Sequence, residues 1–230
     1  MMLEKLKTQH IVEAPLSNIT IYHEQEQSAA QAVIDLLITE NPKIASQLTL
    51  TAPPQIHLFI YDHLQTLHEK YEVLVNRKPA EWVVGTCENN IILTVSPANP
   101  GDDHDFTSIM QVAIHEMVHV YNQQLNPAMP LWIDESLATY LSNMNPRSYN
   151  YQIEYIPTYE EMQLNDSEAF ANAGGYELSY FYIEFLCNTY GWDAVIKLVR
   201  TSDYMQAFSL SPQDVYEKWK TILLEEFKCN

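Results

Sequence analysis

Apolar residues in the first 100 positions follow two spacings, one typical of strands and one typical of helices. Apolar runs of strand length, bounded by Pro, Asn or Gly, occur at 19–23, 56–61, 82–85 and 91–95. A helical stripe covers 24–39 and is expected to end at Asn41 and Pro42, and a shorter helical stretch covers 64–71. Residues 86–90 favour a hairpin between the last two strands. Strands and helices are therefore expected to be mixed in this part of the chain.

From residue 106 onward the apolar spacing is helical. It predicts helices at 106–124, 131–143, 176–190, 192–200 and 212–227. Strands first and helices afterwards indicate an α+β protein with a mixed sheet. We expect an N-terminal α+β lobe at 1–124 and a helical C-terminal lobe at 125–230, which together form one domain.

Composition and charge restrict the classes of function. The 230 residues include 30 Asp and Glu against 12 Lys and Arg, a formal net charge of −18, and 47% of the residues are hydrophobic. A chain this acidic repels phosphate backbones, so no nucleic-acid partner is expected. No stretch reaches the roughly 20 apolar residues that span a bilayer, so no membrane association is expected either.

The location of the protein is predicted from its N-terminus and its cysteines. Residues 1–20 lack the apolar run of a secretory signal. Cys87, Cys187 and Cys229 are widely spaced and odd in number, which favours reduced thiols. We therefore expect a cytoplasmic protein.

His115, Glu116 and His119 form the sequence H-E-x-x-H inside the predicted helix 106–124. Four residues along a helix turn about 400°, so both histidines leave one face, near enough to share a metal ion. Glu116 lies about 100° round the helix, where it can reach a water on that metal without being a ligand. The alternative is a pair of histidines that only pack on a core helix.

A zinc site needs a third protein ligand, and the flanking residues limit the choice. Asn122 and Leu125 stand where metzincins require Gly and His, which excludes that family. Peptide deformylases use a cysteine upstream of H-E-x-x-H as the third ligand, but the sequence around Cys87 does not match the sequence around that cysteine. A carboxylate from the following helix remains.

Glu135 offers this carboxylate, with 15 residues between it and His119. Pro127 and Pro130 break the first helix and let a second begin near residue 131. Two antiparallel helices joined in this way bring Glu135 back to the histidines, and the small Ala138, one turn on, allows their close approach.

These features together resemble the gluzincin metallopeptidases, most closely the peptidase MA-like group. That group carries P-x-W-h-x-E-G-x-A-x-Y on the helix after H-E-x-x-H, and its Glu is the third zinc ligand. In the sequence PLWIDESLATY, Ser136 stands where Gly is usual, and the matching positions are Pro130, Trp132, Glu135, Ala138 and Tyr140. The resemblance covers roughly residues 80–200. It implies a zincin-like fold with one Zn²⁺ held by His115, His119 and Glu135.

The resemblance also implies roles for four further residues. Asp134 would orient a zinc histidine, unless it is only an acid favoured at a helix start. Tyr176 would donate its hydroxyl to the transition-state oxyanion, with Tyr180 as the reserve, and a plain packing role is the alternative for both. Residues 85–89, GTCEN, are similar to the G-A-M-E-N sequence of the related aminopeptidases, in which the Glu binds the substrate amine. Glu88 would then be that contact, although a hairpin turn also favours these residues.

The sequence therefore predicts a zinc-dependent peptidase, with a peptide or protein as substrate. Glu116 would take a proton from the attacking water and pass it to the leaving amine. The strand 91–95 would be the sheet edge that pairs with an extended substrate. Cleavage inside chains or from an end stays open, as does the oligomeric state. The alternative function is a catalytically silent, metallopeptidase-like protein that binds a peptide or a partner protein in its cleft.

Overall fold

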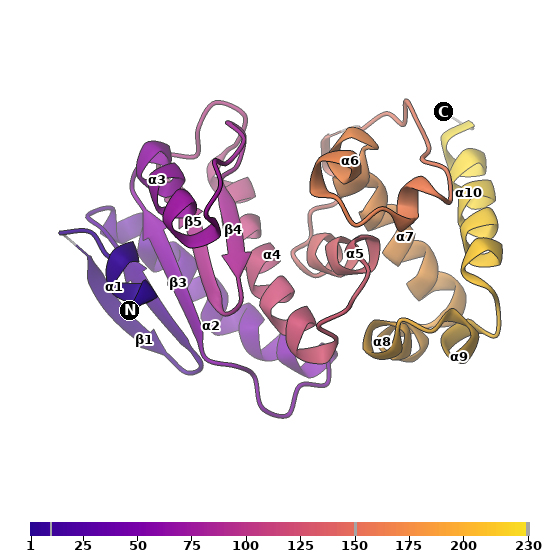
Figure 1. Cartoon of the computed structure of the whole chain (residues 1–230), viewed down its shortest axis with the longest axis horizontal. Helices are drawn as coiled ribbons and strands as arrows, with labels where there is room; N and C mark the ends of the chain where they lie inside the picture. The colour runs from indigo at the N-terminus through magenta and orange to yellow at the C-terminus, as the bar shows by residue number, and fades with distance from the viewer. Residues whose placement is uncertain (10, 150, 229–230) are drawn as a thin grey trace. The chain divides into compact units, whose positions relative to one another are not determined.

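The computed structural model describes residues 1–9, 11–149 and 151–228, and over these residues the chain is α+β, as expected. It divides into two compact units, Met1–Tyr121 and Asn122–Asn230. The boundary falls inside one long helix, α4 (Phe106–Leu125). Figure 1 shows the course of the chain with its helices and strands labelled.

The first unit contains a mixed sheet whose described strands follow the order β1-β2-β3-β5-β4. The strands are β1 (Val12–Leu16), β2 (Ile19–His23), β3 (Ile56–Tyr61), β4 (Gly85–Glu88) and β5 (Ile91–Val95). β2, β3 and β5 pair in parallel, while β1 and β4 run antiparallel to their neighbours at the two edges. The expected bounds of β2, β3 and β5 are confirmed.

Helices cover both faces of this sheet. Figure 1 shows α1 (Met2–Leu6) and α3 (Leu64–Val75) on one side, with α2 (Gln27–Gln47) and α4 on the other. Side chains alternate between the faces of a strand, so Phe59 and Tyr61 share one face and pack with Leu6 and Leu67. The helices thereby bury most of the sheet.

Two expectations about the sheet edge are wrong. β4 begins at Gly85 rather than at residue 82, because Asn89, with φ of 56°, forms a tight turn directly before β5. Residues 86–88 therefore belong to the strand. The edge strand is β4 and not β5, which is hydrogen-bonded to β3 on one side and β4 on the other.

The end predicted at Asn41 and Pro42 for the helix 24–39 is also wrong, because α2 continues through Pro42 to Gln47. A proline inside a helix costs about 3 kcal/mol, since it removes a hydrogen bond and crowds the preceding turn. Beyond it, Ile44 and Leu48 are buried, and each contributes roughly 1.5–3 kcal/mol by leaving water. The free energy gained by burying these two side chains exceeds the cost of the proline.

A ring of hydrogen bonds ties α4 to α2 within the first unit. The Tyr121 hydroxyl donates to Oδ1 of Asn41. Asn41 Nδ2 donates to Oδ1 of Asn18 at 2.9 Å, and Asn18 Nδ2 donates back to the Tyr121 oxygen at 3.2 Å. Tyr121 is fully buried, so these bonds hold α4 two residues after His119.

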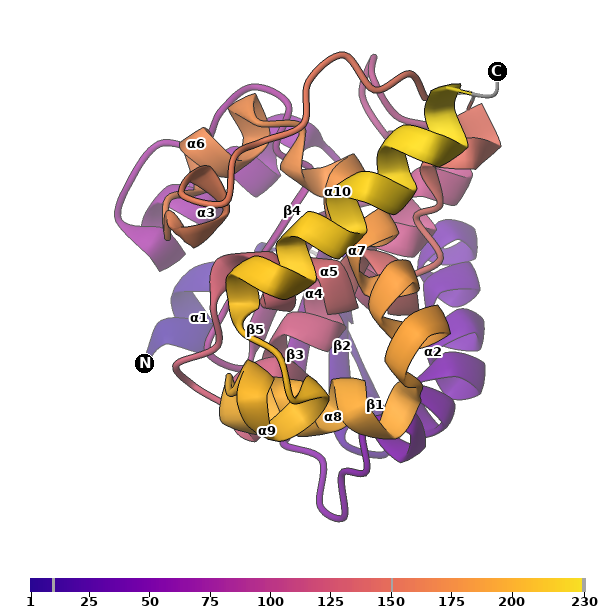
Figure 2. The same cartoon turned by 90° about the vertical axis from the view of Figure 1, so that its right-hand side faces the viewer.

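The second unit is helical, as predicted. Its described α-helices are α5 (Leu131–Leu141), α6 (Ser167–Asn172), α7 (Gly175–Tyr190), α8 (Trp192–Thr201), α9 (Tyr204–Phe208) and α10 (Pro212–Lys228). α7 is the central helix and contacts α5, α6, α8 and α10. Figure 2 shows this unit face-on, with α10 crossing α7. Sequence patterns missed α1, β1, α6 and α9.

Two further findings concern membrane spans and disulfides. No helix in the described ranges is long and apolar enough to cross a membrane. Cys87 and Cys187 are not joined in a disulfide, and Cys229 lies outside the described residues.

Candidate metal centre

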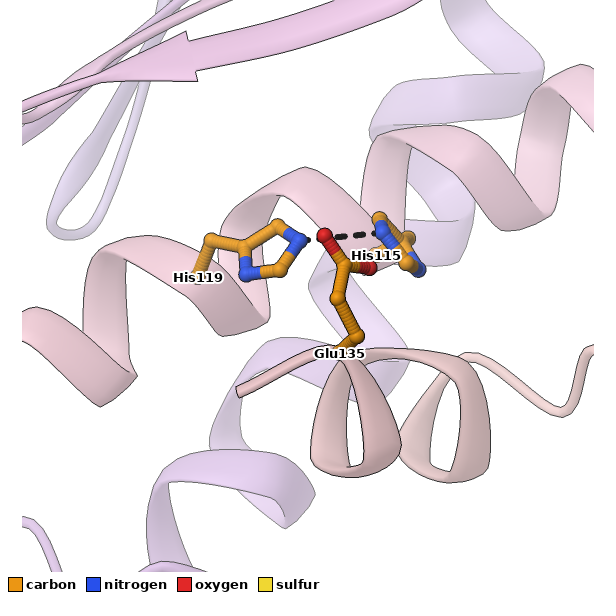
Figure 3. Close-up of side chains that lie close together, drawn as sticks. All are labelled: His115, His119 and Glu135. Atoms are coloured by element: carbon orange, nitrogen blue, oxygen red, sulfur yellow. Dashed lines mark hydrogen bonds between the residues drawn. The ribbon is translucent and has the colours of Figure 1, made fainter. Parts of the chain in front are cut away.

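His115 and His119 lie one turn apart on α4, with exposed fractions of only 6% and 8%. Their Nε2 atoms are 3.0 Å apart, and their ring planes meet at 82°. The two rings therefore present nitrogen atoms to the same point from different directions, as the helical spacing predicts (Figure 3).

Glu135 completes a three-residue group with these histidines. It lies on α5, is 9% exposed, and its carboxylate points toward both imidazoles in Figure 3. One ligand atom from each of the three residues lies within 4.8 Å of the other two. Two imidazoles and a carboxylate, all buried, could bind a metal ion.

The chain between α4 and α5 explains how Glu135 returns to the histidines. The Asn126 amide donates to the carbonyl of Asn122 at 2.8 Å and ends α4. Pro130 is the N-cap of α5, and its carbonyl accepts from the amides of Ile133 and Asp134. The reversal therefore takes five residues, 126–130.

Buried hydroxyls hold α5 in place behind Glu135. Ser136, at the position where gluzincins usually have Gly, is fully buried and donates its hydroxyl to the carbonyl of Trp132. Thr139 donates to the carbonyl of Glu135 at 2.8 Å and lies 3.2 Å from the Ser179 hydroxyl on α7. The serine therefore fits the helix without leaving its hydroxyl unsatisfied.

Glu116 follows His115 on α4 and is partly exposed. The edge strand passes beside it, because a Cβ built on Gly85 would stand 3.3 Å from Oε1 of Glu116. Gly85 thus faces α4, and the alternation of a strand turns Cys87 to the same face and Glu88 to the opposite one. Glu88 is exposed and accepts a hydrogen bond from Asn89 Nδ2 at 3.2 Å.

The remaining predicted residues lie in the second unit. Tyr176, the second residue of α7, packs edge-on against Phe170 with the ring centres 5.0 Å apart. Tyr180 is buried against Tyr140, and this burial raises the pKa of its hydroxyl. The catalytic roles expected of Tyr176, Tyr180 and Glu88 stay predictions.

Asp134 has a partner that the sequence did not indicate. Its Oδ1 accepts a hydrogen bond of 2.7 Å from Nδ2 of Asn122, in the last turn of α4. Asn122 is 1% exposed. No periodicity or motif pointed to this asparagine, because its contact depends on where α5 lies. The expected action of Asp134 on a zinc histidine stays a prediction.

Comparison with known proteins finds no family model that matches this chain and no curated relative.

Proposed function

We propose that this protein is a zinc metallopeptidase of gluzincin type with a zincin-like fold. The observation that carries the proposal is the buried group of His115, His119 and Glu135, whose ligand atoms lie within 4.8 Å of one another. Histidine packing alone explains two imidazoles on one helix face, but it does not explain a carboxylate from another helix aimed at them. A buried carboxylate is costly unless a positive charge lies beside it, and a metal ion shared with the two imidazoles would supply that charge.

The donor set fits zinc. Zinc sites with catalytic activity have three protein ligands of the nitrogen and carboxylate type and leave one position open. Two nitrogens at about 2.05 Å from a tetrahedral ion lie roughly 3.3 Å apart, and the Nε2 atoms here are 3.0 Å apart. A zinc ion held by these residues supplies a coordination position for water and lowers the pKa of that water.

Glu116 is the general base in this proposal. A carboxylate next to a metal-ligand histidine on a helix reaches the water position without binding the ion. Its carboxylate accepts a proton from the attacking water and returns it to the leaving amine. Tyr176 donates a hydrogen bond from its hydroxyl to the transition-state oxyanion, and Tyr180 is the second candidate for this role.

The edge strand β4 supports a peptide as the substrate. Among the described strands it pairs only with β5, so its other edge faces no further strand of this sheet, and an extended chain could be added there. Gly85 brings this strand to Glu116. A peptide added to β4 would therefore run past the proposed general base.

The Glu116→Gln variant tests the proposal. Zinc content and peptide hydrolysis are measured for the wild type, for this variant and for Glu72→Gln on the exposed surface of α3 as the matched control. We expect both variants to keep one zinc, and only Glu116→Gln to lose hydrolysis, by 100-fold or more. Hydrolysis that survives in Glu116→Gln would overturn the mechanism.

A further inference from the structure

We propose that Asn122 is a positioning residue of the metal centre, whose side-chain amide holds the start of α5, and with it Glu135, at the histidine turn of α4. The inference rests on the metal binding in the proposed function but not on peptide hydrolysis. Its basis is the pair of hydrogen bonds that Asn122 Nδ2 donates to Asp134, at 2.7 Å to Oδ1 and at 3.3 Å to the backbone oxygen.

The position of Asn122 makes it suited to this role. It lies three residues after His119, so the two side chains leave neighbouring points of the same helix face. Asp134 immediately precedes Glu135 in the first half of α5. One side-chain amide therefore connects the turn after a histidine ligand to the residue beside the carboxylate ligand.

The strength of the contact fits the role as well. Asn122 is 1% exposed, so water competes little for its amide. The acceptor is a carboxylate, and hydrogen bonds to charged groups are shorter and roughly twice as strong as neutral ones. Both the side chain and the backbone of Asp134 are bonded, which limits movement of this turn of α5.

The precision that a metal requires gives this contact its consequence. Ligand distances in metal sites vary by only about 0.2 Å. The next turn of α5 is hydrogen-bonded through Thr139 to Ser179 on α7. This bond does not join α5 to α4. Loss of the Asn122 contact would weaken the hold of α4 on the turn that carries Glu135, and residues that orient ligands typically contribute 10–100-fold to metal affinity.

A matched pair of variants and a swap test the inference. Asn122→Asp turns the amide donor into an acceptor that faces Asp134. Asn126→Asp makes the same change at a residue whose Nδ2 donates to the Val199 carbonyl and the Ser202 hydroxyl instead. The double variant Asn122→Asp with Asp134→Asn reverses the polarity of the bond and restores it. The readout is the zinc dissociation constant, measured by competition with a chromogenic chelator.

We expect Asn122→Asp to bind zinc 10–100-fold more weakly, Asn126→Asp to stay within about twofold of the wild type, and the swap to recover most of the affinity. Unchanged affinity in Asn122→Asp would overturn the proposal. Asp134→Asn is measured as well. A double variant that binds zinc as weakly as Asp134→Asn alone would also overturn the proposal, because the Asp134 carboxylate would then act without Asn122. If Asn122→Asp does not fold, Asn122→Ser removes the amide without adding charge, and wild-type affinity there would overturn the proposal.

Zinc binding and peptide hydrolysis, both measured on the wild type, distinguish a failure of this inference from a failure of the proposed function. A wild-type protein that binds zinc but hydrolyses no peptide contradicts the peptidase and leaves the role of Asn122 intact. A wild-type protein that binds no zinc overturns both.

Discussion

Gly85 lies so close to Val112, one turn before Glu116 on α4, that position 85 has no room for a side chain. A Cβ built there would stand 3.3 Å from Oε1 of Glu116 and 2.4 Å from Cγ1 of Val112. Real Cβ atoms do not approach other atoms to 2.4 Å, so either the strand or the helix would have to move. The absence of a side chain at this one position sets how near β4 comes to the proposed general base.

Gly85→Ala should therefore reduce both stability and hydrolysis. Overpacking of a filled site costs typically 1–3 kcal/mol, and the displaced strand would carry the substrate away from Glu116. Urea unfolding and the specificity constant for a peptide measure the two effects. Adding Val112→Ala removes the closest contact and should recover part of the loss, whereas Thr86→Ala, on the other face of β4, is the control. A Gly85→Ala protein as stable and active as the wild type would contradict the close approach.

Glu135→Gln should abolish the stabilisation that zinc gives. Ligands that bind only the folded state raise its stability, by about 4 kcal/mol at 1,000 times the dissociation constant. The amide keeps the shape of Glu135 but loses the charge that binds the cation. We expect the melting temperature of the wild type to rise with zinc and that of Glu135→Gln to stay constant, with similar values for the two metal-free proteins. An equal rise in both proteins would exclude Glu135 as a ligand.

Tyr121→Phe should destabilise the first unit. The change removes the hydroxyl that bonds Asn41 and Asn18 and leaves buried polar atoms without that partner. Such a loss costs about 1–3 kcal/mol. Tyr149→Phe removes a hydroxyl from a side chain that is 58% exposed and serves as the control. Equal free energies of unfolding for the two variants would argue against the hydrogen-bond ring.

The stability of the protein should fall at alkaline pH through Cys187. Burial raises the pKa of this thiol to about 11, above its value of about 8.5 in an unfolded chain. Below pH 8.5 the thiol is neutral in both the folded and the unfolded state, so its full contribution to stability is present. Between about pH 8.5 and 11 only the unfolded state loses the proton, so stability declines.

Unfolding free energies measured between pH 7 and 10 check this expectation. The unfolding free energy should fall less steeply with pH in Cys187→Ala than in the wild type. The two slopes are compared, and not the free energies themselves, because the smaller side chain also changes the packing. Tyrosines with a raised pKa, such as Tyr204 with a pKa of about 12, contribute only above about pH 10. Parallel curves for the two proteins would contradict the shifted pKa.

Sequence patterns predicted the elements whose apolar residues follow a regular spacing from end to end. β2, β3 and β5 are apolar runs of the right length, and α4 keeps its helical period over its whole length. The candidate metal group was predictable for another reason. The chemistry of His115, His119 and Glu135 requires particular residue types at fixed spacings, and such spacings are visible without the fold.

The missed elements depend on surroundings that the local sequence does not describe. β1 is an exposed edge strand that contains Pro15, so it lacks the apolar run of a buried strand. α1 and α9 have five residues each, too few for a helical period. α2 passes Pro42 because residues beyond it are buried. The role of Asn122 depends entirely on where α5 returns.

The most direct test of the central claim is the cleavage of a peptide library by the zinc-loaded protein, read by mass spectrometry as new peptide termini. We expect cleavage that a chelator abolishes, that one equivalent of zinc restores, and that Glu116→Gln lacks. Tight binding of one zinc without cleavage of any peptide would contradict it. The site would then belong to a protein that holds a metal and binds a peptide or a partner without cutting it.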